Sequence, residues 1–194
     1  MLKGRPAREE TGASDLHAVI YLERTPEHVF AHWRNLVVAY WIGRTNSSAV
    51  LRLNTALTRL GEEFKEGIGL IQVVHEKAPA PESTSRSALQ AMLRDQSDII
   101  ACSSVVSPGV GFRAASVRAL ITGLVMLARP KFPHLIHATV EETAKWHAEH
   151  LPGGSVPPNP RAILRAIRDI IALDGSATDP HALPGAPAYR KQIL

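Results

Sequence analysis

The chain has 194 residues, of which 45% are hydrophobic and 21% charged, so it can bury a core and does not have the composition of a disordered protein. Its formal net charge is +4, but the arginines are scattered without a run of like charges, which argues against nucleic acid as a partner. The single cysteine, Cys102, excludes an internal disulfide. The N-terminus is polar, and no apolar stretch approaches the roughly 20 residues that span a bilayer. These features favour a cytoplasmic protein without a transmembrane segment.

The first part of the chain alternates between clear and ambiguous signals. Residues 1–15 are charged, small and without periodicity, and are expected to form a flexible N-terminal arm. β-Branched and aromatic residues predict a strand over 17–23, and a near-continuous apolar run predicts a buried strand over 36–43. Between them, residues 26–34 begin like a helix, with Thr25 before a proline and a glutamate, but "HVFAHW" alternates like a strand. We favour a short helix or turn there.

Helices and strands then follow one another regularly. Asn46 and Ser47 are suitable caps, and leucines at helical spacing predict an amphipathic helix that ends near Phe64. The later predicted elements are strands at 67–75, 98–106 and 133–140 and helices at 83–95, 112–129 and 141–151. Strands separated by helices of this length imply a parallel sheet with helices on its faces. The sequence therefore predicts an α/β domain over residues 16–151, with a mixed, largely parallel sheet of four to five strands.

The C-terminal part reads as a helical extension. "PGGSVPPNP", residues 152–160, is typical of a linker, residues 161–173 of an amphipathic basic helix, and residues 174–194 of an extended tail rich in proline, alanine and glycine. The apolar side of the helix carries Ile163, Leu164, Ile167, Ile170 and Ile171, and its basic side carries Arg161, Arg165 and Arg168. Such a helix can pack on its own domain, on a second copy or in a groove of a partner, and an anionic lipid surface is the less favoured alternative.

A glycine motif precedes the helix at 112–129. The segment Gly109-Val110-Gly111-Phe112-Arg113-Ala114 satisfies the letters of the dinucleotide fingerprint G-x-G-x-x-A. That fingerprint belongs to the first strand-to-helix turn of its unit and requires an acidic residue at the end of the next strand, whereas the strand after this helix ends without one. We therefore expect no nucleotide cofactor. Gly109 and Gly111 are interpreted as a tight turn, and with Arg113 they are candidate contacts for an anion or a partner.

Catalytic and metal-binding patterns are scarce. His28 and His32 are four residues apart and supply at most half of a metal site, and His147 and His150 are interpreted as part of a solvated helix face. Cys102 lies in the apolar run "IIACSSVV" and is interpreted as a buried, inert thiol. The chain lacks the nucleophile elbow G-x-S-x-G, the zinc motif H-E-x-x-H and the phosphate-binding G-x-x-x-x-G-K-[ST]. We expect no catalytic residue, no metal and no cofactor.

Two phrases and the order of the elements carry a family resemblance. "YWIGRTNSSAV" joins a strand to a helix, and "GVGFRAASVRALITGL" does so again later in the chain. With the order of strands and helices between 16 and 151, they resemble the STAS domain of anti-sigma-factor antagonists and the related SpoIIAA-like family. The resemblance implies a small regulatory module that works through protein partners. It also implies a phosphorylated serine at a helix start, for which Ser83 and Ser85 are the candidates; a cap of the helix by Ser83 is the alternative reading.

These observations together predict a function without catalysis. We expect a regulatory or assembly module that acts through contacts with a protein partner or through self-association, with the C-terminal helix as a contact element. The alternative is a protein that binds a small ligand or a lipid in a cleft at the strand ends, between Ser104 and Arg113.

Overall fold

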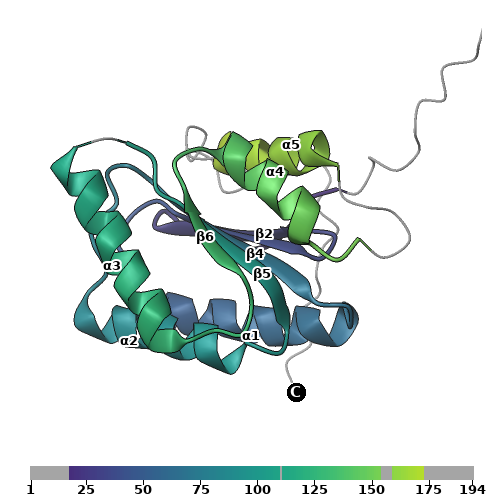
Figure 1. Ribbon diagram of the computed structural model, residues 1–194, viewed down its shortest axis with the longest axis horizontal. Coiled ribbons are helices and arrows are strands. Elements are labelled where there is room, and N and C mark those ends of the chain that lie inside the picture. The colour runs from purple at the N-terminus through teal and green to yellow at the C-terminus, as the bar shows by residue number, and fades with distance from the viewer. Residues whose placement is uncertain (1–17, 110, 154–158, 173–194) are drawn as a thin grey trace, which may run out of the picture.

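Six strands form one sheet in the order in which they occur along the chain. The computed structural model describes residues 18–109, 111–153 and 159–172 (Figure 1). The strands are β1 (Ile20–Arg24), β2 (His28–Trp33), β3 (Leu36–Trp41), β4 (Ile68–Val74), β5 (Ile100–Val106) and β6 (His134–His137). β1, β2 and β3 are antiparallel neighbours, and β3 to β6 are parallel. The predicted α/β class with a mixed, mostly parallel sheet is confirmed, but the predicted four to five strands are too few.

The additional strand is β2, where a helix or turn was favoured. The Thr25 hydroxyl accepts hydrogen bonds from the backbone N–H groups of Glu27 (3.2 Å) and His28 (3.0 Å), so the apparent helix start is a turn that leads into a strand. A two-residue turn at Arg34, with φ of 54°, and Asn35 then reverses the chain into β3. All six side chains of β2 are buried, because helices cover both faces of the sheet.

The helices lie in two layers on opposite faces of the sheet (Figure 1). They are α1 (Ser47–Glu63), α2 (Ser83–Asp95), α3 (Phe112–Ala128), α4 (Val140–His150) and α5 (Pro160–Ile171). Each crossover from β3 to β6 moves one strand further in the same direction, which places α1, α2 and α3 on one face. α4 and α5 cover the other face. No helix within the described ranges is long and apolar enough to cross a membrane.

Each face has its own core. Leu53, Leu57 and Leu60 of α1 are buried against the sheet on one face. On the other face, Ile163 and Ile167 of α5 pack with buried side chains of β2, β3 and β5. The two clusters share the sheet as a common wall, so the strands between them are apolar on both sides.

Side-chain caps fix the helix starts. The Asn46 side chain accepts from the Ala49 N–H at 2.8 Å, as predicted for α1. The Asn159 side chain accepts from the Arg161 N–H at 2.8 Å, with Pro160 at the first helical position of α5. α4 begins with a capping box in which Thr139 and Glu142 each accept from the other's backbone N–H. These local signals explain why the helix boundaries could be predicted closely.

Candidate functional site

The helix α3 is apolar on nearly every side and is the least embedded of the helices on its face. It packs mainly on α2 and makes few contacts with the sheet. Of its described side chains, only those of Ala114 and Ala128 are buried, whereas those of Phe112, Met126 and Leu127 are 89%, 71% and 70% exposed. A helix that is hydrophobic all round is normally covered on all sides. Both sides of α3, the one toward the sheet and the one toward solvent, are therefore candidate binding surfaces.

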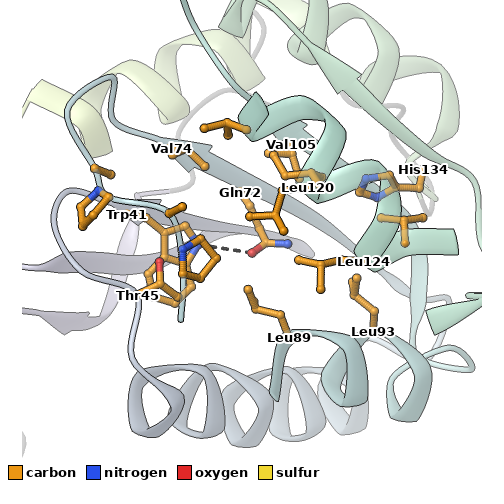
Figure 2. A pocket seen from close by; sticks show the side chains of 17 residues that line it. Trp41, Thr45, Gln72, Val74, Leu89, Leu93, Val105, Leu120, Leu124 and His134 are labelled. Carbon is orange, nitrogen blue, oxygen red and sulfur yellow. Dashed lines mark hydrogen bonds between the residues drawn. The ribbon is translucent and has the colours of Figure 1, made fainter. Parts of the chain in front are cut away.

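A cavity lies between α3 and the sheet, and we call it the α3 cavity. It encloses about 70 Å³. Its walls come from the ends of β3, β4 and β5, from α2 and α3, and from the loop at residues 78–81. Side chains that line it include Val74, Leu89, Leu93, Val105, Leu120 and Leu124 (Figure 2). No Asp, Glu, Lys or Arg is among the lining residues that the structure describes.

Three polar side chains, those of Thr45, Gln72 and His134, interrupt these apolar walls. Gln72, on β4, is 7% exposed, and its Oε1 accepts a hydrogen bond of 3.3 Å from Trp41 Nε1. The amide nitrogen of Gln72 points away from Trp41 (Figure 2). His134, at the start of β6, has neither ring nitrogen paired with a described group, although both nitrogens are shielded from solvent. Burial and the neighbouring His137 lower the pKa of His134 to about 4, so its ring is neutral at pH 7.

An open groove continues from this cavity along the carboxyl ends of β4 and β5. The two share Val74, Ala78 and Val117, and the groove has a volume of about 320 Å³. His75, Glu76, Lys77 and Ser107 give the groove a polar and charged rim. The apolar cavity therefore opens toward a polar edge, as expected for the carboxyl end of a parallel sheet.

Two glycines precede α3, where a tight turn was predicted, and residue 110 between them lies outside the described part of the structure. Gly109 and Gly111 have φ values of 98° and 88°, which favour glycine, and Gly111 is the N-cap of α3. Arg118 donates to the carbonyl oxygens of Ser107 (3.3 Å) and Gly109 (3.4 Å) and so ties the turn to the helix. The side chain of Arg113 lies outside the described part of the structure.

The two candidate phosphoacceptors differ in accessibility. Glu82, not Ser83, is the N-cap of α2, and it makes no side-chain capping bond, so the alternative reading of Ser83 as the cap is wrong. Ser83 is exposed at the first helical position. Ser85 is 2% exposed. Only Ser83 thus presents its hydroxyl at the surface.

The candidate partner helix, α5, is part of the protein's own core. Ile163, Ile167 and Ile170 are fully buried, and Leu164 and Ile171 are partly buried against the same cluster. The exposed side of the helix carries Arg161, Arg165 and Arg168. Arg168 donates to Glu141 of α4 at 2.7 Å. A partner of α5 would therefore meet its arginine side and not its isoleucine side.

The sequence reading of His147 as part of a solvated helix face is wrong. Its side chain is fully buried, with Nε2 at 2.9 Å from Ser104 Oγ and Nδ1 at 3.4 Å from Cys102 Sγ. Burial, and then the neighbouring His137, His150 and His134, lower the pKa of His147 to about 3. Burial raises the pKa of Cys102 to about 12. A neutral, enclosed thiol is the opposite of an activated nucleophile.

Within the segment from Ser104 to Arg113, where a cleft was predicted, Ser107, Pro108 and Gly109 line the groove at the strand ends, but Ser104 does not. Ser103 and Ser104 are fully buried, and Ser104 points toward α4. The cavity on the α3 face begins instead at Val105, the next residue along β5. Because successive side chains of a strand point to opposite faces, a shift of one residue changes the face of the sheet.

His28 and His32 lie on a strand and do not form a metal site. His28 stacks on Phe30, with ring centroids 4.3 Å apart, and its Nε2 lies 3.3 Å from a carboxylate oxygen of Glu23. Burial lowers the pKa of His28, and Glu23 partly opposes this shift. His32 Nδ1 is hydrogen-bonded to the carbonyl oxygen of Arg34 at 2.9 Å. Within the described residues, no group of three or more His, Cys, Asp or Glu side chains is arranged to hold a metal ion.

Sequence reasoning missed Gln72 and His134 as the polar groups of the cavity. A single glutamine inside the apolar strand "GLIQVVH" and a histidine at the start of a short strand were the only signals for them. The outer surface of α3 had a clearer signal, since apolar and small residues recur along the whole of "FRAASVRALITGLVMLA" and no acidic residue interrupts them.

Comparison of the chain with protein-family models, with curated proteins and with solved structures finds no match in any of the three.

Proposed function

We propose that this chain is a non-enzymatic assembly or regulatory module, in the manner of the STAS and SpoIIAA-like proteins that its sequence resembles, and that it acts through protein contacts made by the outer face of α3. The outer face consists of Phe112, Ala115, Ser116, Ala119, Thr122, Gly123 and Met126, with Leu127 beside it. The observation that carries the proposal is the exposure of Phe112, Met126 and Leu127 on one helix. Exposed apolar patches of this kind mark interaction surfaces.

The chemistry of the outer face suits another apolar helix. None of its described side chains is charged. The Ser116 hydroxyl donates to the carbonyl oxygen of Phe112 and the Thr122 hydroxyl to that of Arg118, each at 2.9 Å, so both donors are satisfied within α3. A Cβ placed on Gly123 would meet nothing within 4 Å. Ala115, Ala119 and Gly123 therefore leave room for a second helix to approach closely.

The pattern of the outer face is symmetric about Ala119. Ser116 and Thr122 lie three residues on either side of it, Ala115 and Gly123 four residues, and Phe112 and Met126 seven residues. An antiparallel copy of α3, related by a twofold axis through Ala119, would place Phe112 of one chain against Met126 of the other. The small residues would then meet at the centre. A twofold interface requires such a self-complementary surface, so a second copy of this chain is the occupant we propose.

The proposed contact would bury large apolar side chains from both copies. Full burial of a Phe, Met or Leu side chain contributes about 1.5–3 kcal/mol relative to its exposure. Each copy offers three such side chains on or beside the outer face. That contribution must offset the loss of translational and rotational freedom on association, which makes a reversible dimer the expected state.

We propose a function without catalysis because the side chains of Cys102 and Ser104 are buried and are not activated as nucleophiles. Cys102 and Ser104 both contact the buried His147, and no substrate could reach them in this fold. The low pKa of His147 and the high pKa of Cys102 keep the pair neutral at pH 7. This cluster is interpreted as a polar part of the core.

The test is a charge introduced at one end of the outer face. Met126→Glu would set a carboxylate against Phe112 of the second copy, and we expect the dimer dissociation constant, measured by sedimentation velocity, to rise by at least about tenfold because a charge without a partner is costly to bury. The double variant Phe112→Lys/Met126→Glu places an ammonium group opposite each carboxylate, and dimerisation should return.

The matched control is Leu51→Glu on α1, where the original side chain is 65% exposed. This variant introduces the same charge away from α3 and should leave the dimer unchanged. A single-chain mass at every concentration would refute self-association. Failure of the double variant to restore a dimer that Met126→Glu had lost would refute the antiparallel arrangement.

A further inference from the structure

The α3 cavity has features of a ligand site that the contact at the outer face does not use. Its walls are apolar, and none of its described lining residues is charged. Cavities lined in this way tend to stay dry and to accept apolar molecules, because a water needs two to four polar partners. The cavity is covered by α3, which packs mainly on α2.

The polar groups of the cavity indicate what a ligand must carry. Trp41 occupies the Gln72 oxygen, which leaves the amide nitrogen of Gln72, a double donor, on the cavity side (Figure 2). The neutral ring of His134 offers one N–H and one acceptor nitrogen, and neither is paired with a described group. Buried polar groups are normally satisfied. An oxygen atom of a ligand could accept from Gln72, whereas the shielded ring nitrogens of His134 do not face the open space of the cavity.

The volume limits the shape of the ligand. The enclosed 70 Å³ is about half of the 150 Å³ of an engineered cavity that binds benzene, so it would hold about three to four non-hydrogen atoms of a slender chain. A longer molecule could continue past Val74 and Ala78 into the adjoining groove. The charged rim formed by Glu76 and Lys77 belongs to that groove and not to the cavity.

We propose that the α3 cavity binds an uncharged, unbranched and largely hydrocarbon molecule that carries a hydroxyl or carbonyl oxygen, with the amide nitrogen of Gln72 as its polar contact. A carboxylate or an ammonium group of the same chain length would have no countercharge in the cavity, and burial of an unpaired charge is costly. The cavity therefore favours uncharged ligands over charged ones.

The test uses three probes of equal chain length: butan-1-ol, butanoate and butylammonium. Each is titrated into the protein while the NMR signals of the Gln72 side-chain amide are followed. We expect a saturable shift with butan-1-ol and binding weaker by at least about tenfold for the two charged probes. Because the signal is read at Gln72, the outcome does not depend on whether the outer faces of α3 associate.

A pair of variants locates the site. Leu124→Trp points an indole into the cavity and should abolish the saturable shift, whereas Leu127→Trp makes the same substitution on the exposed side of α3 and should leave it intact. The proposal is overturned if butan-1-ol gives no saturable shift, if butanoate binds as well as butan-1-ol, or if both tryptophan variants still bind equally. The comparison of the three probes uses the unmodified protein and so remains decisive if a variant fails to fold.

Discussion

The helices α5 and α3 are both rich in apolar residues, yet the fold treats them differently. α5 separates its isoleucines from its arginines, and Ile163, Ile167 and Ile170 are fully buried. α3 has apolar residues on nearly every side, buries only two alanines among its described side chains, and leaves Phe112 almost fully exposed. The helix with the stronger amphipathic pattern has become part of the core, and the helix without one has kept an uncovered surface.

The difference follows from where each helix stands relative to the sheet. On one face, α5 covers β2 and β3 and α4 covers β5 and β6, and the apolar side chains of α5 pack into the core of that face. α3 lies next to α2 on the other face, with a cavity beneath it. A sheet can bury one side of a helix but not both. A helix at the edge of the fold that is apolar on nearly all sides therefore keeps one surface that only another molecule could cover.

The largest expected effect comes from truncation on α5. Ile167→Ala should lower the free energy of unfolding by about 2–5 kcal/mol, because it leaves a cavity in a closely packed region. Leu127→Ala on α3 removes a side chain that is 70% exposed and should change the free energy of unfolding by no more than about 0.5 kcal/mol. Urea unfolding of the two variants at one protein concentration measures both values. Equal losses would mean that α3 is as deeply embedded as α5.

The second effect concerns pH and His147, which the α4 side of the sheet holds neutral. The unfolded chain takes up a proton on this residue near pH 6.5, whereas the folded protein does so only near pH 3. Between these values the unfolded state binds more protons. The contribution of His147 to the free energy of unfolding is therefore fully present above pH 6.5 and declines as the pH falls, by up to about 1.4 kcal/mol per pH unit. His147→Gln retains a donor and an acceptor near Ser104 but cannot be protonated.

Urea unfolding at about pH 7.5 and about pH 4.5 separates this contribution from those of the other titrating groups. The unmodified protein should lose about 2–3 kcal/mol more than His147→Gln over this range. If both proteins lose the same free energy, then His147 is reached by solvent in the folded state and its contacts with Cys102 and Ser104 are not maintained.

Much of the fold could be predicted from the sequence because the local signals were strong. Asn46, Thr139 and Asn159 cap helices, and buried strands alternate with these helices. The strand β2 was not the favoured prediction, although "HVFAHW" alternates like a strand. The Thr25-Pro26 start suggested a helix, and only pairing with β1 and β3 decides against it.

The site was less predictable, because burial depends on contacts between distant segments. His147 looks like a surface histidine within "KWHAEHL", and only the packing of α4 on β5 brings it to Ser104 and Cys102. Gly69 makes room for this packing, since a Cβ there would lie 3.2 Å from His147 Nδ1. The positive φ values of Gly109 and Gly111 were easier to anticipate, because a positive φ is a local property that the residue type itself indicates.

The smallest expected effect lies on the outer side of α5. Arg168 donates to Glu141 at 2.7 Å, and this contact, after the backbone hydrogen bond at Glu141 itself, lowers the pKa of the carboxyl. Both side chains are about half exposed, so solvent screens the pair, and Arg168→Ala should change the free energy of unfolding by at most about 0.5 kcal/mol. Any such loss should disappear at high salt. A loss comparable to that of Ile167→Ala would show that the arginine side of α5 also holds the fold together, because a solvent-exposed ion pair does not contribute that much.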